Sequence, residues 1–288
     1  MRLLSSRRRH PATRALLLAL ALSVMGVLYA TVAPTPASNA DGQSSTQVAE
    51  GEALYKVGCA SCHGLNAEGT SQGPTLIGVG SASVDFQMGT GRMPATAPGA
   101  QIPTKPKTYS DEEIAAIGAY IDSLDIGVTV PKPSQYSLEK PVRSQFPDGH
   151  DGDTAYQESL DEYYRVVALG GELFRTNCSA CHNYQGTGGA LPEGKYAPSL
   201  EGVEGKHVWE AMRTGPQQMP VFSEDVISDE EAAAMIAYLN DIHGQRNNGG
   251  LTLGGYGPVG EGLWAWIIGI GGLCCFAVWI TRKGVRAK

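Results

Sequence analysis

The stretch Cys59-Ala60-Ser61-Cys62-His63 recurs later in the chain as Cys178-Ser179-Ala180-Cys181-His182. The pattern C-x-x-C-H is the attachment signature of a c-type haem. Its two thiols bind one porphyrin as thioethers, and the histidine that follows is held where its imidazole becomes the proximal ligand of the iron. A zinc site would need two more Cys or His ligands, and a thioredoxin-like dithiol has no need of the adjoining histidine. The two copies therefore predict two covalently bound c-type haems.

The surroundings of the motif are repeated as well, which indicates a tandem duplication. Gly51-x-x-Leu54-Tyr55 precedes the first copy, and Gly170-x-x-Leu173-Phe174 lies at the same distances before the second. Three more pairs follow in the same order: Pro74 and Pro198 in Pro-x-Leu-x-Gly, Met93 and Met219 before a proline, and Ser110 and Ser228 before Asp-Glu-Glu. Each copy is expected to have its own haem and its own hydrophobic core.

Methionine is the candidate distal ligand, because a thioether is a soft ligand suited to haem iron and raises its reduction potential. In the first copy Met93 is preferred, since it precedes Pro94 after a glycine-rich approach, and Met88 is the alternative. In the second copy Met219 is the candidate. His207 is the reserve ligand there, although a surface or capping role is expected for it. Packing or surface roles are also expected for Met212, Met235, His150 and His243.

Both ends of the chain carry apolar segments. Arg7-Arg8-Arg9 precedes an uncharged run that reaches Ala33, so residues 1–33 are expected to be an export signal that is either cleaved or kept as an anchor helix. Residues 263–280 are uncharged, have tryptophans near both edges and are followed by the basic tail 281–288. This pattern predicts a transmembrane helix whose C-terminal tail is cytoplasmic.

Charge is distributed unevenly along the chain. The segment between the two ends holds all 29 acidic residues against 13 basic ones, a formal charge of −16. Such a segment is not suited to nucleic acid, whose phosphates are bound by basic residues. Its negative charge would complement a basic partner surface. Equally, the charge would be typical of a domain that is acidic only for solubility.

Each half of the chain resembles a class I cytochrome c, in which a first helix, C-x-x-C-H, a Pro-x-Leu-x-Gly loop, a distal methionine and a closing helix follow in this order. The resemblance implies a mainly α fold in which a glycine of the first helix lets an aromatic residue of the last helix approach closely. Gly51 with Tyr120, and Gly170 with Tyr238, match those places.

The resemblance also implies a role for the loop prolines and a division of the chain. The carbonyls of Pro74 and Pro198 are expected to accept a hydrogen bond from the proximal imidazoles and so to orient them. Residues 46–126 and 153–244 are expected to form the two cytochrome c domains. The connecting segments are a tether over residues 34–45, a Pro-rich linker over 127–152 and a Gly-rich linker over 245–262.

The complete arrangement is similar to the di-haem cytochrome c subunit of the actinobacterial cytochrome bc complex, a menaquinol–cytochrome c reductase. The resemblance implies haem domains on the extracytoplasmic face of the cell membrane. It implies a cytochrome b subunit and a Rieske iron–sulfur subunit as partners, with the quinol chemistry on those partners. It further implies that electrons pass from the Rieske centre through the two haems to a haem-copper oxidase within a respiratory supercomplex.

Two distal methionines would leave no open iron position, so this chain is expected to conduct electrons and not to catalyse a reaction at its own irons. Three alternatives remain, and a purely structural or ligand-sensing haem protein is the least favoured of them, because two low-spin haems in one chain favour electron conduction. A membrane-tethered di-haem carrier could act without being a fixed subunit, and co-purification with cytochrome b distinguishes it. A di-haem peroxidase would need a vacant or switchable distal position, which a high-spin haem spectrum would reveal.

Overall fold

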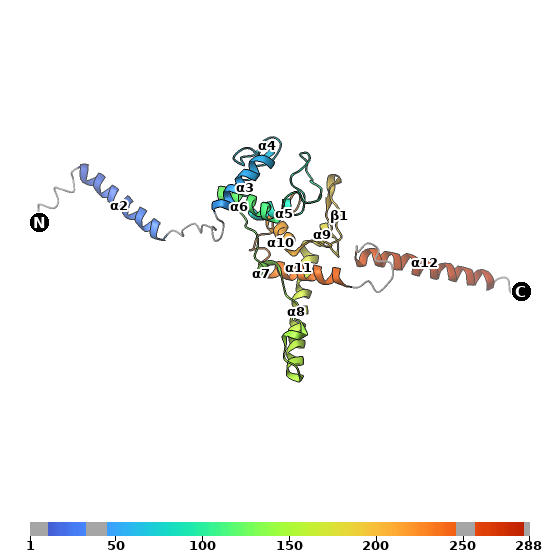
Figure 1. The fold of residues 1–288 in the computed structure, drawn as a ribbon. Helices are drawn as coiled ribbons and strands as arrows, with labels where there is room; N and C mark the ends of the chain where they lie inside the picture. The colour runs from blue at the N-terminus through green and yellow to red at the C-terminus, as the bar shows by residue number, and fades with distance from the viewer. Residues whose placement is uncertain (1–10, 33–44, 246–256, 285–288) are drawn as a thin grey trace. The chain divides into compact units, whose positions relative to one another are not determined.

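The computed structural model describes residues 11–32, 45–245 and 257–284, which are mainly helical (Figure 1). Residues 1–44 and 45–288 form two units. The expectations for residues 34–44 of the tether, residues 285–288 of the basic tail and most of the Gly-rich linker fall outside the described residues.

The first unit contains helix α2 (Pro11–Val32). Its alanines and leucines favour a helix, and the apolar part that the structure describes runs over Ala15–Met25 with its leucines exposed. The helix therefore coincides with the apolar run of the expected export signal or anchor.

The first domain of the second unit is built around two helices that cross at a glycine. Its helices are α3 (Ser45–Gly58), α4 (Ala60–His63), α5 (Ser81–Gly89) and α6 (Asp111–Leu124). A Cβ atom on Gly51 would lie 1.9 Å from the carbonyl oxygen of Ala116, so no larger residue fits between α3 and α6. The rings of Tyr55 and Tyr120 lie 5.2 Å apart beside this crossing, and both belong to the hydrophobic core.

The second domain repeats this crossing with longer elements. They are α8 (His150–Asn177), α9 (Ser179–His182), β1 (Gly189–Ala190), the 3-10 turn η2 (Pro192–Gly194), β2 (Tyr196–Ala197), α10 (Gly205–Thr214) and α11 (Asp229–Gly244). A Cβ atom on Gly170 would lie 2.1 Å from the carbonyl oxygen of Ala234, and the rings of Phe174 and Tyr238 lie 5.9 Å apart. The antiparallel pair of β1 and β2 extends the loop that follows the haem motif.

Both closing helices begin with a capping box, in agreement with the repeated Ser-Asp-Glu-Glu. The Ser110 hydroxyl accepts a hydrogen bond from the Glu113 amide, and the Glu113 carboxylate accepts one from the Ser110 amide. Ser228 and Glu231 form the same reciprocal pair. These bonds satisfy amides that a helix start leaves open, and the acidic first turn complements the helix dipole.

The segment between the domains is more ordered than its prolines indicated. It contains α7 (Pro133–Tyr136) and the 3-10 turn η1 (Arg143–Gln145), and α8 already begins at residue 150. Gln135 donates a hydrogen bond to the Asp229 carboxylate at 2.6 Å, and Tyr136 packs against the core of the second domain. These tertiary contacts hold part of the Pro-rich segment against the second domain.

Helices α5 and α10 join the two domains. Each lies between the Pro-x-Leu-x-Gly loop and the methionine loop of its own domain, and the two helices pack against each other. A second contact lies beside them, where the Gln101 amide group donates to the Tyr196 carbonyl at 2.7 Å and accepts from the Tyr196 amide at 3.1 Å. The two domains therefore share a direct interface.

Helix α12 (Pro258–Gly284) ends the described chain. Its segment Gly260–Arg282 is 23 residues long and apolar enough to cross a membrane by length and composition, and none of it is buried against the rest of the protein. Among the described residues it is the one helix that meets this measure. It covers the expected transmembrane residues 263–280.

Candidate haem-binding sites

Each C-x-x-C-H motif forms one helical turn directly after the first helix of its domain. The His63 amide donates to the Cys59 carbonyl at 3.0 Å, and the His182 amide donates to the Cys178 carbonyl at 2.9 Å. Residues three and four apart share one face of such a turn. The two thiols and the imidazole of each motif are therefore presented together, as attachment to a single porphyrin requires.

The loop prolines lie at the imidazoles of both motifs. His63 Nδ1 is 2.7 Å from the Pro74 carbonyl oxygen, and His182 Nδ1 is 3.0 Å from that of Pro198. A carbonyl oxygen can only accept, so Nδ1 carries the proton and Nε2 keeps the lone pair that binds a metal. Burial lowers the pKa of His182, which also favours the neutral ring.

The motif cysteines are unpaired thiols, which suits thioether formation. Burial, with a smaller contribution from the second motif thiol, raises the pKa of Cys59 and of Cys178 to about 11. At neutral pH both therefore remain uncharged and available for bonding to a haem vinyl group. Two free thiols beside a histidine with an open Nε2 fit a c-type haem in each domain.

Both loop methionines pack against the core of their own domain. Met93 is partly buried and packs, like Cys59, against the core of the first domain. Met219 is partly buried and packs with Cys178 against the core of the second. Met88 lies instead on α5 and is 5% exposed within the first core. Its position matches the packing role that was the alternative to iron binding.

The remaining methionines and histidines have different surroundings. Met212 and Met235 are buried in the second core, as expected. His150 is exposed at the start of α8, and the His243 ring nitrogen Nε2 is 2.7 Å from the Gln185 carbonyl oxygen. His207 is not a surface residue: it is 8% exposed. The surface expectation was wrong for it, because α10 packs on α5 of the other domain and covers this side chain.

Sequence reasoning also missed Arg213, which fastens the chain that follows Met219. This buried guanidinium donates to the carbonyls of Phe222 and Ile227 at 2.9 and 2.7 Å and to the Asp229 carboxylate at 2.7 Å. It therefore ties the methionine loop to the start of α11. No local pattern distinguishes such an arginine from a solvated one, since its partners come from elements that meet only in the fold.

The fold and the two sites define the class of proteins with tandem cytochrome c domains. Residues 48–125 match the family described as "Cytochrome c", and residues 165–239 match the family described as "Cytochrome C oxidase, cbb3-type, subunit III". These matches confirm the expected fold class of two cytochrome c domains. The chain thus carries two covalently bound c-type haems, one in each domain.

Curated relatives narrow this class to one family. The cytochrome bc1 complex cytochrome c subunit of Mycobacterium tuberculosis (strain ATCC 25618 / H37Rv) is 41% identical over 279 residues, which cover 96% of this chain and 93% of the relative. The protein of the same name from Mycobacterium leprae is 41% identical over 270 residues, 93% and 87% of the two chains. That from Corynebacterium diphtheriae is 38% identical over 277 residues, 96% and 95%. The chain belongs to the family of cytochrome bc1 complex cytochrome c subunits, electron-transport proteins of the membrane.

Proposed function

We propose that this chain relays electrons from a Rieske iron–sulfur centre through its two haems to a haem-copper oxidase. In this proposal it is the cytochrome c subunit of a menaquinol–cytochrome c reductase and works beside a cytochrome b subunit, which holds the quinol site with the Rieske subunit. Helix α12 anchors the chain in the cell membrane, with the haem domains on the extracytoplasmic face and the tail in the cytoplasm.

The observation that carries this proposal is the shared interface of two haem domains, each of which has a methionine in the loop before its closing helix. We assign His63 and Met93 as the axial ligands of the first iron, and His182 and Met219 as those of the second. When bound, each haem supplies a one-electron redox centre. The chain contributes the orientation of the imidazoles through Pro74 and Pro198, a methionine on each distal side, and direct contact between the domains through α5 and α10.

Ligand assignment is tested by exchanging each methionine for leucine, which has a similar volume but no sulfur. A methionine-ligated ferric haem displays a characteristic absorbance band, to which both haems contribute. Met93→Leu and Met219→Leu are each expected to remove one half of this band. The matched control is Met88→Leu, which changes a core residue of the first domain and should leave the band intact. Loss of the band in Met88→Leu, with retention in Met93→Leu, would reverse the assignment in that domain.

The relay itself is tested on the full chain purified in mild detergent through a tag. We expect cytochrome b, a Rieske protein and oxidase subunits to co-purify, and menaquinol to reduce both c-type haems. Isolation of the chain alone with two low-spin haems would instead identify a tethered carrier. A high-spin ferric haem that reacts with peroxide would identify a peroxidase.

A further inference from the structure

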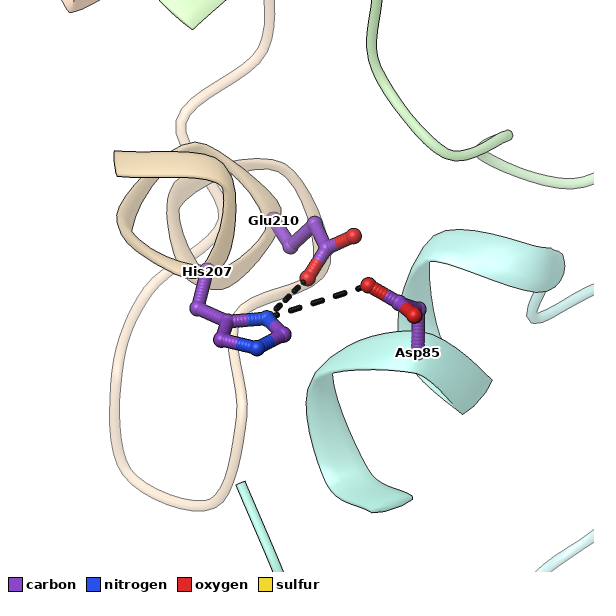
Figure 2. Close-up of side chains that lie close together, drawn as sticks. All are labelled: Asp85, His207 and Glu210. Atoms are coloured by element: carbon purple, nitrogen blue, oxygen red, sulfur yellow. Dashed lines mark hydrogen bonds and ion pairs between the residues drawn. The ribbon is translucent and has the colours of Figure 1, made fainter. Parts of the chain in front are cut away.

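The interface between the two haem domains contains a compact group of three side chains that could bind a metal. The ligand-type atoms of Asp85, His207 and Glu210 all lie within 4.8 Å of one another. His207 Nδ1 is 2.7 Å from Glu210 Oε2 and 3.8 Å from Asp85 Oδ2 (Figure 2). Asp85 comes from α5 of the first domain, whereas the other two lie three residues apart on one face of α10. One imidazole nitrogen thus faces carboxylates from both domains.

This group is withdrawn from solvent and is not fully satisfied. Glu210 is 0% exposed, and its Oε1 atom lies buried without a hydrogen-bond partner. His207 is 8% exposed. A buried carboxyl oxygen without a partner costs free energy, and a bound cation would remove that cost.

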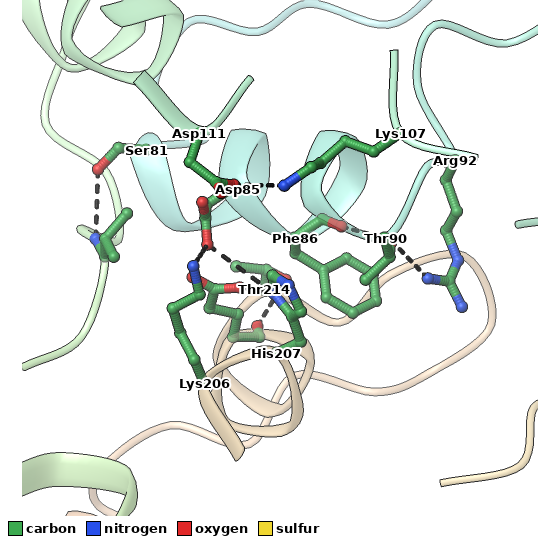
Figure 3. Close-up of polar contacts among 12 residues, drawn as sticks. Ser81, Asp85, Phe86, Thr90, Arg92, Lys107, Asp111, Lys206, His207 and Thr214 are labelled. Atoms are coloured by element: carbon green, nitrogen blue, oxygen red, sulfur yellow. Dashed lines mark hydrogen bonds and ion pairs between the residues drawn. The ribbon is translucent and has the colours of Figure 1, made fainter. Parts of the chain in front are cut away.

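Lys206 places a positively charged ammonium group beside these three side chains. Its Nζ atom is 2.6 Å from Asp85 Oδ2, and its side chain is 27% exposed at the rim of the group (Figure 3). This ion pair is with Asp85, whereas the Glu210 carboxyl group contacts His207 instead.

We propose that Asp85, His207 and Glu210 bind a divalent transition-metal ion of the zinc type between the two haem domains. An imidazole nitrogen with two carboxylates suits zinc and its neighbours, whereas magnesium and calcium prefer oxygen ligands alone. Zinc bonds of about 2.0–2.2 Å require these atoms to converge from their present separation, and water can occupy a fourth position. Because the ligands come from α5 and α10, the ion would link the two domains directly.

The test uses the full chain with both haems, purified through a tag that lacks histidine and then freed of loose metal with a chelator. Zinc is added, its ratio to haem iron is measured by mass spectrometry, and its affinity is measured by titration calorimetry. We expect one zinc ion for every two haem irons. Glu210→Gln and His207→Gln are expected to weaken the affinity at least about tenfold, since each removes a ligand.

Two further variants make the test specific. Lys206→Gln removes the competing ammonium and is expected to strengthen zinc binding, whereas an ion pair with no metal function predicts no gain. Glu201→Gln changes an exposed carboxylate of the same domain and should leave the affinity unchanged. Unchanged haem spectra show that each variant is folded. The proposal is overturned if no stoichiometric zinc binds, if Glu210→Gln binds it as well as the parent chain, or if Lys206→Gln gives no gain.

Discussion

At the scale of single residues, the haem sites depend on atoms that local sequence does not bring together. The His63 and His182 rings are oriented by carbonyls that lie 11 and 16 residues further along the chain. Such a bond orients the ring and leaves Nε2 available to bind iron. The second site adds Arg213, whose hydrogen bonds hold the loop that contains Met219.

Replacing this arginine is expected to loosen the distal side of one haem only. Arg213→Met removes three charge-assisted hydrogen bonds and should destabilise the second domain by about 2–3 kcal/mol. We expect a smaller fraction of methionine-ligated haem in the second domain, with haem content and the first domain unchanged. Absorbance and magnetic resonance spectra of the ferric protein measure this fraction. Arg165→Met, at an exposed ion pair, is the control, and equal spectra for the two variants would contradict a positioning role.

At the scale of secondary-structure elements, each domain depends on two helices that approach closely at a glycine. The missing side chains of Gly51 and Gly170 let the helix backbones meet, and the aromatic pair beside each crossing fills the adjoining volume. Close packing of this kind does not tolerate an added methyl group without displacement of the helices.

Gly170→Ala is therefore expected to destabilise the second domain by about 1–3 kcal/mol, because the new methyl group meets the Ala234 carbonyl. Gly244→Ala is the control, since a Cβ atom at this position of α11 meets nothing within 4 Å. Urea unfolding followed by haem absorbance measures both variants. A Gly170→Ala protein as stable as the Gly244→Ala protein would show that the crossing can relax.

The Asp229 carboxylate connects three elements, and its ionisation is expected to make the stability of the fold sensitive to acid. Burial opposes its ionisation, but hydrogen bonds from Arg213, Gln135 and Trp209 outweigh this and lower its pKa. A carboxyl whose pKa is lower in the folded than in the unfolded chain stabilises the fold above the unfolded value of about 3.9. That contribution is lost as the pH falls through the lowered pKa.

Asp229→Asn should accordingly lower the stability at neutral pH and make its decline in acid shallower than in the parent chain. Urea midpoints between about pH 7 and pH 3 measure this difference. The exposed Asp225→Asn is the control, and it should follow the parent curve. A parallel decline of the Asp229→Asn and parent proteins would show that this carboxylate does not contribute.

At the scale of the whole molecule, two haem domains share an interface and are followed by a helix able to cross a membrane. Polar contacts between the domains include the Lys206–Asp85 ion pair and the paired Gln101 and Tyr196 groups. Gln217 adds a bond to the Ile102 carbonyl at 3.1 Å. Direct contact of this kind suits electron transfer between fixed redox centres.

Removal of α12 is expected to separate the haem domains from the proposed membrane partners. A chain that ends at Gln245 should keep both low-spin haem spectra, because the residues of both cores precede this point. We expect it to lose co-purification with cytochrome b, since the apolar segment Gly260–Arg282 would no longer be present. A chain that lacks only residues 285–288 is the control. Retention of cytochrome b by the shorter chain would place the contact on the haem domains.

The sequence by itself determined the haem chemistry and the duplication. C-x-x-C-H specifies its cofactor through local spacing, and the paired glycines, prolines and capping serines repeat at matching distances, so each could be identified without a fold. Met88 and Met93 remained alternatives because both are chemically suitable. The fold separates their surroundings by placing Met88 on buried α5 and Met93 in the loop beyond it.

Only the tertiary structure decided how the two domains meet. Asp85 and His207 are far apart in the chain, and nothing in the sequence near either residue indicates the other. Their contact arises because α5 and α10, which belong to different domains, pack against each other. Local sequence patterns indicate covalent chemistry and the starts of helices. Which polar side chains become buried, and which groups they contact, depends on surfaces that form only when both domains have folded.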